Sequence, residues 1–189
     1  MILDLTAYVI IPIYTFLFVN GTNWFTSNLS VIGSDEGRQT AFFMLGVIIG
    51  LYYHTVLERL LKYLPHRRLE HSLLHLALFL LILAVATPYL PDSFPFEAFL
   101  HVACAFVASI ILLLCLYLTV WRLSRLSAQT NRHLRPYRIM LIFITIISAA
   151  LLIAAGIIST ALEIFFVIAT TLMVQKLYRQ SACIFPDSN

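Results

Sequence analysis

Three histidines and one glutamate in the first half of the chain have the spacing of a metal site. His54 and Glu58 are four residues apart, and so are His71 and His75. In a helix this spacing puts both members of a pair on one face, where imidazoles and a carboxylate suit zinc or iron. Ordinary hydrogen bonding near the headgroups is the favoured explanation of the same residues, and the sequence predicts no bound metal or other cofactor.

A second group combines carboxylates with one imidazole. Glu97 and His101 are again four residues apart, Asp92 lies shortly before them, and Glu163 stands near the start of the last apolar segment. A carboxylate beside a histidine can act as a general acid–base pair in hydrolysis or group transfer. The alternative is that these groups lie at helix ends, where a carboxylate near the N-terminus is stabilised by the helix dipole.

Possible nucleophiles lie earlier in the chain, at Ser27, Ser30 and Ser34. None of them belongs to the GxSxG motif that holds a hydrolase serine on a sharp turn. The chain also lacks the glycine-rich loop that binds phosphate in nucleotide enzymes. The sequence therefore offers candidate catalytic residues without a complete signature, and it leaves open whether the protein is an enzyme.

Composition indicates which elements position these residues. Of 189 residues, 61% are hydrophobic and only 11% are charged, and the mean hydropathy is +0.92. A soluble domain carries about 25% charged residues, so a bilayer is the better environment for this apolar surface. A spanning helix needs about 20 mostly apolar residues. Six segments qualify, at about 2–19, 40–61, 70–90, 96–121, 138–159 and 161–178.

The predicted fold is therefore all-α, a polytopic integral membrane protein with one six-transmembrane-helix bundle over residues 1–180. Pro12 is expected to kink the first span, and residues 122–137 are expected to form a loop. The last two spans are close enough in sequence to form a tight hairpin. Residues 181–189 would form a short cytoplasmic tail.

The basic residues predict the orientation of the bundle, because short loops rich in Lys and Arg stay in the cytoplasm. Only Arg38 lies in the loops of one side, so that side is outside and both termini are cytoplasmic, as in a bacterial cytoplasmic membrane. This topology explains the net charge of +3 without a nucleic-acid partner and favours contact with anionic lipid. The other eleven basic residues are Arg59, Lys62, Arg67, Arg68, Arg122, Arg125, Arg132, Arg135, Arg138, Lys176 and Arg179.

The same orientation separates the two groups of candidate residues. Asp92, Glu97, His101 and Glu163 fall on the outer side, whereas the group containing His54 falls on the inner side. One active site cannot use both groups. Small residues at Gly46 and Gly50 form a GxxxG pattern in the second span, which could pack within the bundle or join two copies of the chain.

The long outer loop has the most distinctive sequence of the chain, NWFTSNLSVIG at residues 23–33. It resembles the first outer loop of an uncharacterised group of bacterial six-span membrane proteins, similar to the eukaryotic DRAM and Frag-type proteins. The resemblance implies a six-span fold and a role in lipid handling. The positions that carry it are Trp24, Ser27, Asn28, Ser30 and Gly33.

From these observations we expect a protein that binds or organises lipid, or a partner membrane protein, through its outer face. The outer loop, with Arg38 as its only cation, would contact the ligand. The alternative is a membrane-embedded lipid-modifying enzyme that uses His101, Glu97 and Asp92. A small transporter or channel subunit is less favoured, because Asp, Glu, Lys and Arg are missing from the centres of the predicted spans.

Overall fold

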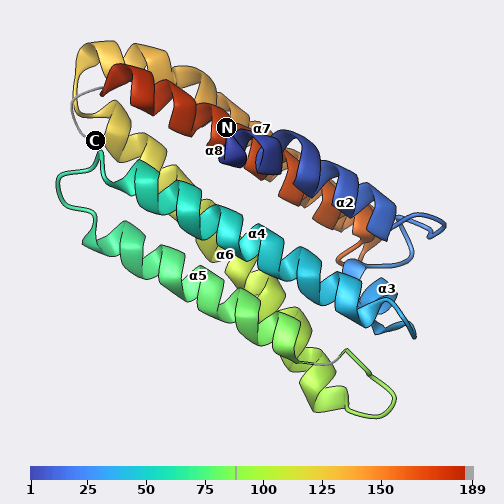
Figure 1. Ribbon diagram of the computed structural model, residues 1–189. Helices are drawn as coiled ribbons and strands as arrows, with labels where there is room; N and C mark the ends of the chain where they lie inside the picture. The colour runs from blue at the N-terminus through green and yellow to red at the C-terminus, as the bar shows by residue number, and fades with distance from the viewer. Residues whose placement is uncertain (88, 186–189) are drawn as a thin grey trace.

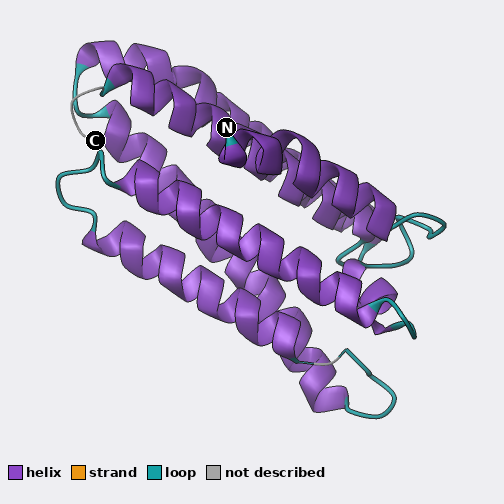
Figure 2. Cartoon of the chain, viewed as in Figure 1, coloured by secondary structure: helices purple, strands orange, loops and turns teal. Residues whose placement is uncertain are grey.

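The chain folds as a bundle of helices, and its described part contains no β-strand (Figure 1, Figure 2). The computed structural model describes residues 1–87 and 89–185. The short elements are α1 (Ile2–Leu5), the π-helical turn η1 (Thr6–Ile10), α2 (Ile11–Phe18) and α3 (Leu29–Ser34). The long elements are α4 (Gln39–Leu61), α5 (Arg68–Ala86), α6 (Pro95–Ser124), α7 (Ala128–Ala155) and α8 (Thr160–Ile184).

Helices α4 to α8 are each long and apolar enough to cross a bilayer, which confirms the prediction of an all-helical protein compatible with a multi-pass membrane topology. The shortest of them, α5, has 19 residues. At a rise of 1.5 Å per residue it extends over roughly 28 Å, close to the thickness of the hydrocarbon core. The first predicted span corresponds to the shorter apolar segment Ile2–Phe18.

A π-helical turn, η1, ends two residues before Pro12, where the sequence predicts a kink. A proline within a helix has no N–H to donate, and its ring crowds the carbonyl four residues earlier. A wider π turn at this point accommodates the missing hydrogen bond while the helix continues. Residues Ile2–Phe18 therefore form one continuous helical segment.

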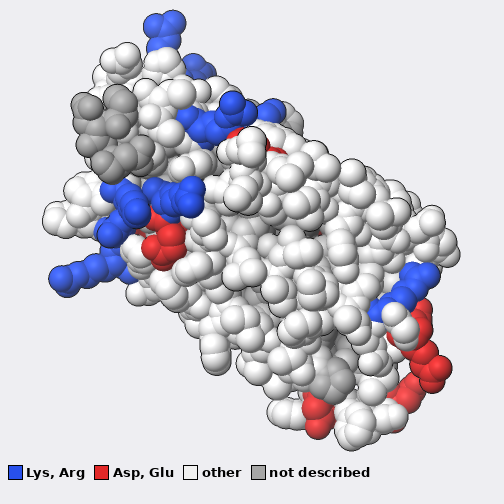
Figure 3. Space-filling view, in the orientation of Figure 1, with Lys and Arg blue, Asp and Glu red and all other residues white. Residues whose placement is uncertain are grey.

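The long helices form a closed ring. Helix α5 packs against α4 and α6, α7 packs against α6 and α8, and α8 closes the ring against α4. The N-terminal segment lies outside this ring, where α2 contacts α4 and α8 (Figure 1). Figure 3 shows Lys and Arg side chains gathered at the end that carries the α4–α5 connection, whereas acidic side chains predominate at the other end.

Side-chain size differs between the two halves of the ring. Large, fully buried side chains fill the half near the α4–α5 connection, and they include Leu57, Leu60, Leu116, Met173 and Leu177. Small residues occupy many positions in the other half, and they include Gly46, Ala77, Ala84, Ala105 and Ala108. These small residues line a cavity in the half of the ring near the outer loop.

Gly46 allows close approach of two helices within the chain. A Cβ atom at Gly46 would lie 2.7 Å from Cγ2 of Val85 on α5, whereas one at Gly50 would meet Leu81 at 3.8 Å. A contact below about 3 Å forces a neighbouring group to shift, so a larger residue at Gly46 would displace the Val85 side chain or α5 itself. This geometry supports the intramolecular explanation of the GxxxG pattern.

The predicted loop 122–137 is mostly helical in the structure. Helix α7 begins at Ala128 instead of about Arg138, because Ser127 acts as its N-cap and its Oγ accepts a hydrogen bond of 3.0 Å from the N–H of Thr130. At its other end α7 stops at Gly156, whose φ of 69° is left-handed. Helix α8 continues to Ile184, so it includes the start of the predicted tail, while residues 186–189 lie outside the described part.

Candidate functional site

We call the half of the ring next to the loop at residues 23–33 the outer half. Its small side chains leave a cavity of about 350 Å³ in the middle of the ring. Its walls come from all five long helices and are mainly apolar. Phe106, Ile110 and Ala149 line the cavity and are also exposed at the surface, so the cavity reaches the outside of the bundle beside α6 and α7. Four polar residues lie at its outer end, Asn28, Ser30, His101 and Glu163.

A serine and a histidine form a direct hydrogen bond in this cavity. Ser30 belongs to the short helix α3 and His101 to α6, and both side chains are buried. Ser30 Oγ lies 2.6 Å from Nε2 of His101. The other ring nitrogen, Nδ1, lies 2.9 Å from the backbone carbonyl oxygen of Thr87. The imidazole is therefore held from both sides.

The carbonyl of Thr87 determines which nitrogen of His101 carries the proton. A carbonyl oxygen can only accept, so Nδ1 donates to it and the neutral ring keeps a free electron pair on Nε2. Nε2 then accepts the hydroxyl proton of Ser30. This is the arrangement in which a histidine can act as general base to a serine nucleophile, with a backbone carbonyl in the orienting position that a carboxylate occupies in a serine-protease triad.

Glu163 holds the start of α3 in place. Its Oε2 accepts a hydrogen bond of 2.6 Å from the backbone N–H of Leu29, the residue before Ser30. The side chain of Asn28 caps the same helix, since its Oδ1 accepts from the N–H of Val31 at 2.8 Å. Glu163 thus has a positioning contact with the loop in addition to its place at the N-terminal end of α8.

Backbone contacts attach the outer loop to the beginning of α8. The N–H of Thr160 donates to the carbonyl of Ser27 at 2.7 Å, and the N–H of Ala161 donates to the carbonyl of Trp24 at 2.9 Å. The amides at a helix N-terminus have no partners within the helix, so these loop carbonyls satisfy them. The loop is consequently part of the bundle and closes its outer end.

Several predicted site residues lie away from the cavity. Asp92 is exposed and Glu97 is half-buried, and within residues 1–87 and 89–185 neither bonds to His101 nor lines the cavity. Trp24 packs its ring on Phe16 with centroids 6.0 Å apart. Arg38, the predicted outer cation, donates from Nη1 to the carbonyl of Phe18 at 3.2 Å.

Gly33 has a packing role beside the site. A Cβ atom at this position would lie 2.5 Å from Cγ of Phe42. The ring of Phe42 in turn packs against the rings of His101 and Phe18, with centroid distances of 6.0 and 6.1 Å. The absence of a side chain at Gly33 therefore lets α3 approach Phe42 of α4, whose ring also contacts His101.

Sequence reasoning missed the polar groups deeper in the cavity. Tyr53 lines it from α4, and its hydroxyl lies 2.6 Å from Oγ1 of Thr170 and 3.1 Å from Oγ1 of Thr171. Ser148 also lines the cavity, and its buried Oγ has no hydrogen-bond partner in the described part of the chain. In the sequence, the only indication of these polar groups was the pair Thr170 and Thr171 in the middle of the apolar segment that forms α8.

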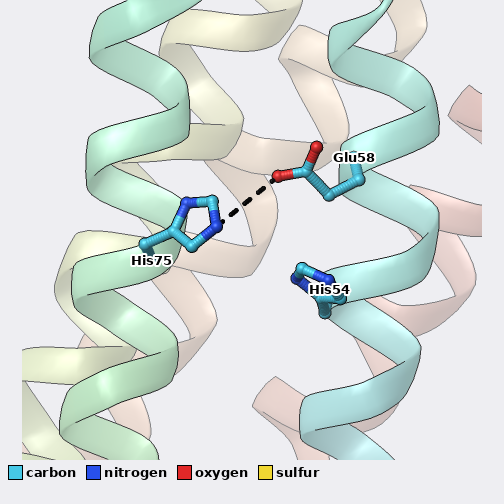
Figure 4. Close-up of side chains that lie close together, drawn as sticks. All are labelled: His54, Glu58 and His75. Atoms are coloured by element: carbon cyan, nitrogen blue, oxygen red, sulfur yellow. Dashed lines mark ion pairs between the residues drawn. The ribbon is translucent and has the colours of Figure 1, made fainter.

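The inner group of residues is also brought together, at the opposite end of the molecule. His54 and Glu58 lie one turn apart on α4, and His75 lies opposite them on α5 (Figure 4). One donor atom from each of these three lies within 4.8 Å of the others. His71 adds a nitrogen, Nδ1, at 2.9 Å from Oε1 of Glu58. The predicted cluster therefore exists as a spatial group.

Comparison of the chain with protein-family models, with curated proteins and with solved structures found no match.

Proposed function

We propose that this protein spans the membrane and binds a lipid in the cavity of its outer half. An acyl chain would enter between the helices and lie along the apolar walls. The polar headgroup or ester would meet Ser30, His101, Asn28 and Glu163 at the outer end. The observation that carries this proposal is the cavity itself, whose 350 Å³ falls within the range of about 300–1,000 Å³ typical of small-ligand sites.

The membrane orientation is part of the proposal. In a six-span arrangement the shorter segment Ile2–Phe18 would be the first span, and both termini would be cytoplasmic. Support comes from the concentration of Lys and Arg at one end of the bundle, as the positive-inside rule requires (Figure 3). The cavity and the outer loop would then face the outer leaflet.

Lipid binding can be tested by filling the cavity. Ala105 and Ala103 are both half-buried on α6, but only Ala105 lines the cavity. In Ala105→Phe the added ring would occupy acyl-chain volume, whereas Ala103→Phe provides the matched control. We expect crosslinking to a photoactivatable phospholipid in native membranes to fall about tenfold in the first variant, equivalent to ~1.4 kcal/mol, and to persist in the second. Equal crosslinking of both variants would refute the cavity as the binding site.

The Ser30–His101 hydrogen bond favours a second candidate function, acyl transfer from the bound lipid. Ser30 Oγ would attack an ester carbonyl while its proton passes to Nε2 of His101. The ester C–O bond would break as His101 returns that proton to the departing alcohol, and an acyl group would remain on Ser30. Water or a second alcohol would then release the acyl group by the reverse sequence of proton transfers.

A fluorophosphonate probe tests this chemistry, because it reacts with activated serine hydroxyls. We expect labelling of the intact protein at Ser30, loss of labelling in Ser30→Ala and a strong decrease in His101→Gln. Ser34→Ala is the matched control, because this serine lies on the same short helix but its hydroxyl donates to the carbonyl of Val31. Labelling that survives Ser30→Ala would exclude Ser30 as the nucleophile and leave lipid binding as the function.

A further inference from the structure

The polar cluster of His54, Glu58 and His75 near the α4–α5 connection contains a buried oxygen that has no hydrogen-bond partner in the described part of the chain. Glu58 Oε1 is buried and makes no hydrogen bond of acceptable geometry within the described part of the chain. Nevertheless two imidazole nitrogens are close to this oxygen, Nδ1 of His71 at 2.9 Å and Nε2 of His75 at 3.9 Å. A buried carboxylate oxygen surrounded by nitrogens at these positions is suited to a cation.

The hydrogen bond on the far side of His75 indicates which of its nitrogens faces Glu58. Nδ1 of His75 lies 2.7 Å from the backbone carbonyl of His71 and must donate to it. In the neutral ring Nε2 therefore carries a lone pair, and Figure 4 shows this side of the His75 ring turned toward the carboxylate of Glu58. Two electron-rich atoms that face each other are stabilised by a positive charge between them, which either a proton on Nε2 or a metal ion can supply. Donation of the remote N–H to a backbone carbonyl is also how metal-binding histidines are usually oriented.

His54 supplies a third possible metal-ligand atom beside those of Glu58 and His75. It lies one turn before Glu58 on α4, and its ring centroid is 6.0 Å from that of His75 (Figure 4). The three donor atoms are within 4.8 Å of one another. Bonds of about 2.0–2.1 Å in a tetrahedral zinc site bring ligand atoms to roughly 3.3 Å, so each side chain needs to move by about 1 Å or somewhat more. Exposed rings make such rotations readily.

We propose that His54, Glu58 and His75 bind one divalent transition-metal ion, for which zinc is the best match, between α4 and α5. Two histidines and a carboxylate are an established zinc ligand set, and the exposure of His54 and His75 gives the ion access and leaves a fourth position for water. His71 is a positioning residue, because its Nδ1 lies 2.9 Å from Oε1 of Glu58 and its carbonyl orients His75. The ion would tie α4 to α5 independently of the outer cavity.

The basic residue next in sequence to Glu58 does not oppose this cation. Arg59 lines a different groove, which α4 forms with the N-terminal segment and α8. Adjacent residues on a helix point about 100° apart, so Arg59 is directed away from the α4–α5 face. The carboxylate of Glu58 therefore provides the negative charge at the cluster itself.

Cobalt binding tests the proposal, since Co²⁺ takes zinc ligands and has a visible ligand-field spectrum. We would titrate the purified full-length protein with Co²⁺ after chelator treatment, and then displace it with Zn²⁺. One equivalent with a tetrahedral spectrum is expected. His54→Ala, His75→Ala and Glu58→Gln should each weaken binding at least about tenfold. His66→Ala is the matched control, because His66 is exposed in the same connection but outside the cluster.

A second variant separates loss of a ligand from loss of the fold. In His75→Cys a thiolate replaces the imidazole, and we expect Co²⁺ to remain bound with a new sulfur-to-metal charge-transfer band. A Cys183→Ser background removes the exposed native thiol. Absence of this band, or Co²⁺ affinity that decreases as much in His66→Ala as in His75→Ala, would overturn the assignment. Glu58 and His75 would then be an ordinary imidazolium–carboxylate pair.

Discussion

Removal of the Glu163 carboxylate should make local opening of the short helix α3 more frequent. In Glu163→Ala the buried N–H of Leu29 loses its partner at 2.6 Å. Leaving a buried donor unpaired costs about 1–3 kcal/mol. Because about 1.4 kcal/mol corresponds to a factor of ten, local opening should become roughly 5- to 150-fold more frequent. Amide hydrogen exchange over Leu29–Ser34 measures this directly, since exchange of protected amides follows local opening.

Two variants decide whether this reasoning is correct. Glu163→Gln keeps an acceptor oxygen, so its effect on exchange should be clearly smaller than that of Glu163→Ala. Glu97→Ala removes another outer carboxylate, from the first turn of α6, which has no bond to the loop in the described structure. Exchange in α3 that is equally fast in Glu163→Ala and Glu97→Ala would mean that the loop is held by other contacts, and the argument from the 2.6 Å hydrogen bond would fail.

Further outcomes follow from packing and from the buried ion pair. Gly33→Ala puts a methyl group 2.5 Å from the ring of Phe42, so overpacking should cost about 1–3 kcal/mol in thermal unfolding and decrease fluorophosphonate labelling of Ser30. Arg122→Ala leaves the fully buried carboxylate of Glu70 without the guanidinium that lies 2.7 and 2.8 Å from its oxygens, which should cost about 3–5 kcal/mol. Arg125→Ala, which removes a guanidinium 3.9 Å from an exposed Trp121 ring, should cost only about 0.5–1 kcal/mol in the same unfolding assay.

The long helices could be predicted from composition because each is encoded by a local run of apolar residues. The boundaries of the helices were harder to predict from the sequence. The apolar run predicts a fifth span that begins at about Arg138, but the helix starts at Ala128. The intervening turns carry Arg132 and Arg135, and polarity there indicates solvent exposure without excluding helix. The N-cap at Ser127 was the informative residue.

The candidate site was only partly accessible to sequence reasoning. Ser30 and His101 were each identified, but they are 71 residues apart and come from different elements. His101 was paired with Glu97 because helical spacing is visible in the sequence, whereas its actual partners are a serine and the carbonyl of Thr87. Local periodicity predicts neighbours on one face of a helix. The contacts of His101, however, depend on how α3 packs against the long helices, which periodicity does not indicate. The inner cluster was predicted more completely, because both of its pairs follow helical spacing and a short connection joins their helices.

Small residues in the apolar helices of this chain have two different structural effects. Between neighbouring helices they permit close contact, as Gly46 does against Val85 of α5. Around the cavity of the five-helix ring, however, small side chains such as Ala105 and Ala108 leave space that they do not fill. Fully buried Leu and Met side chains fill the half near the α4–α5 connection, whereas a cavity remains in the other half. A pattern on one helix cannot distinguish these cases, and for this reason the proposed lipid site depends on the closed ring rather than on any single motif.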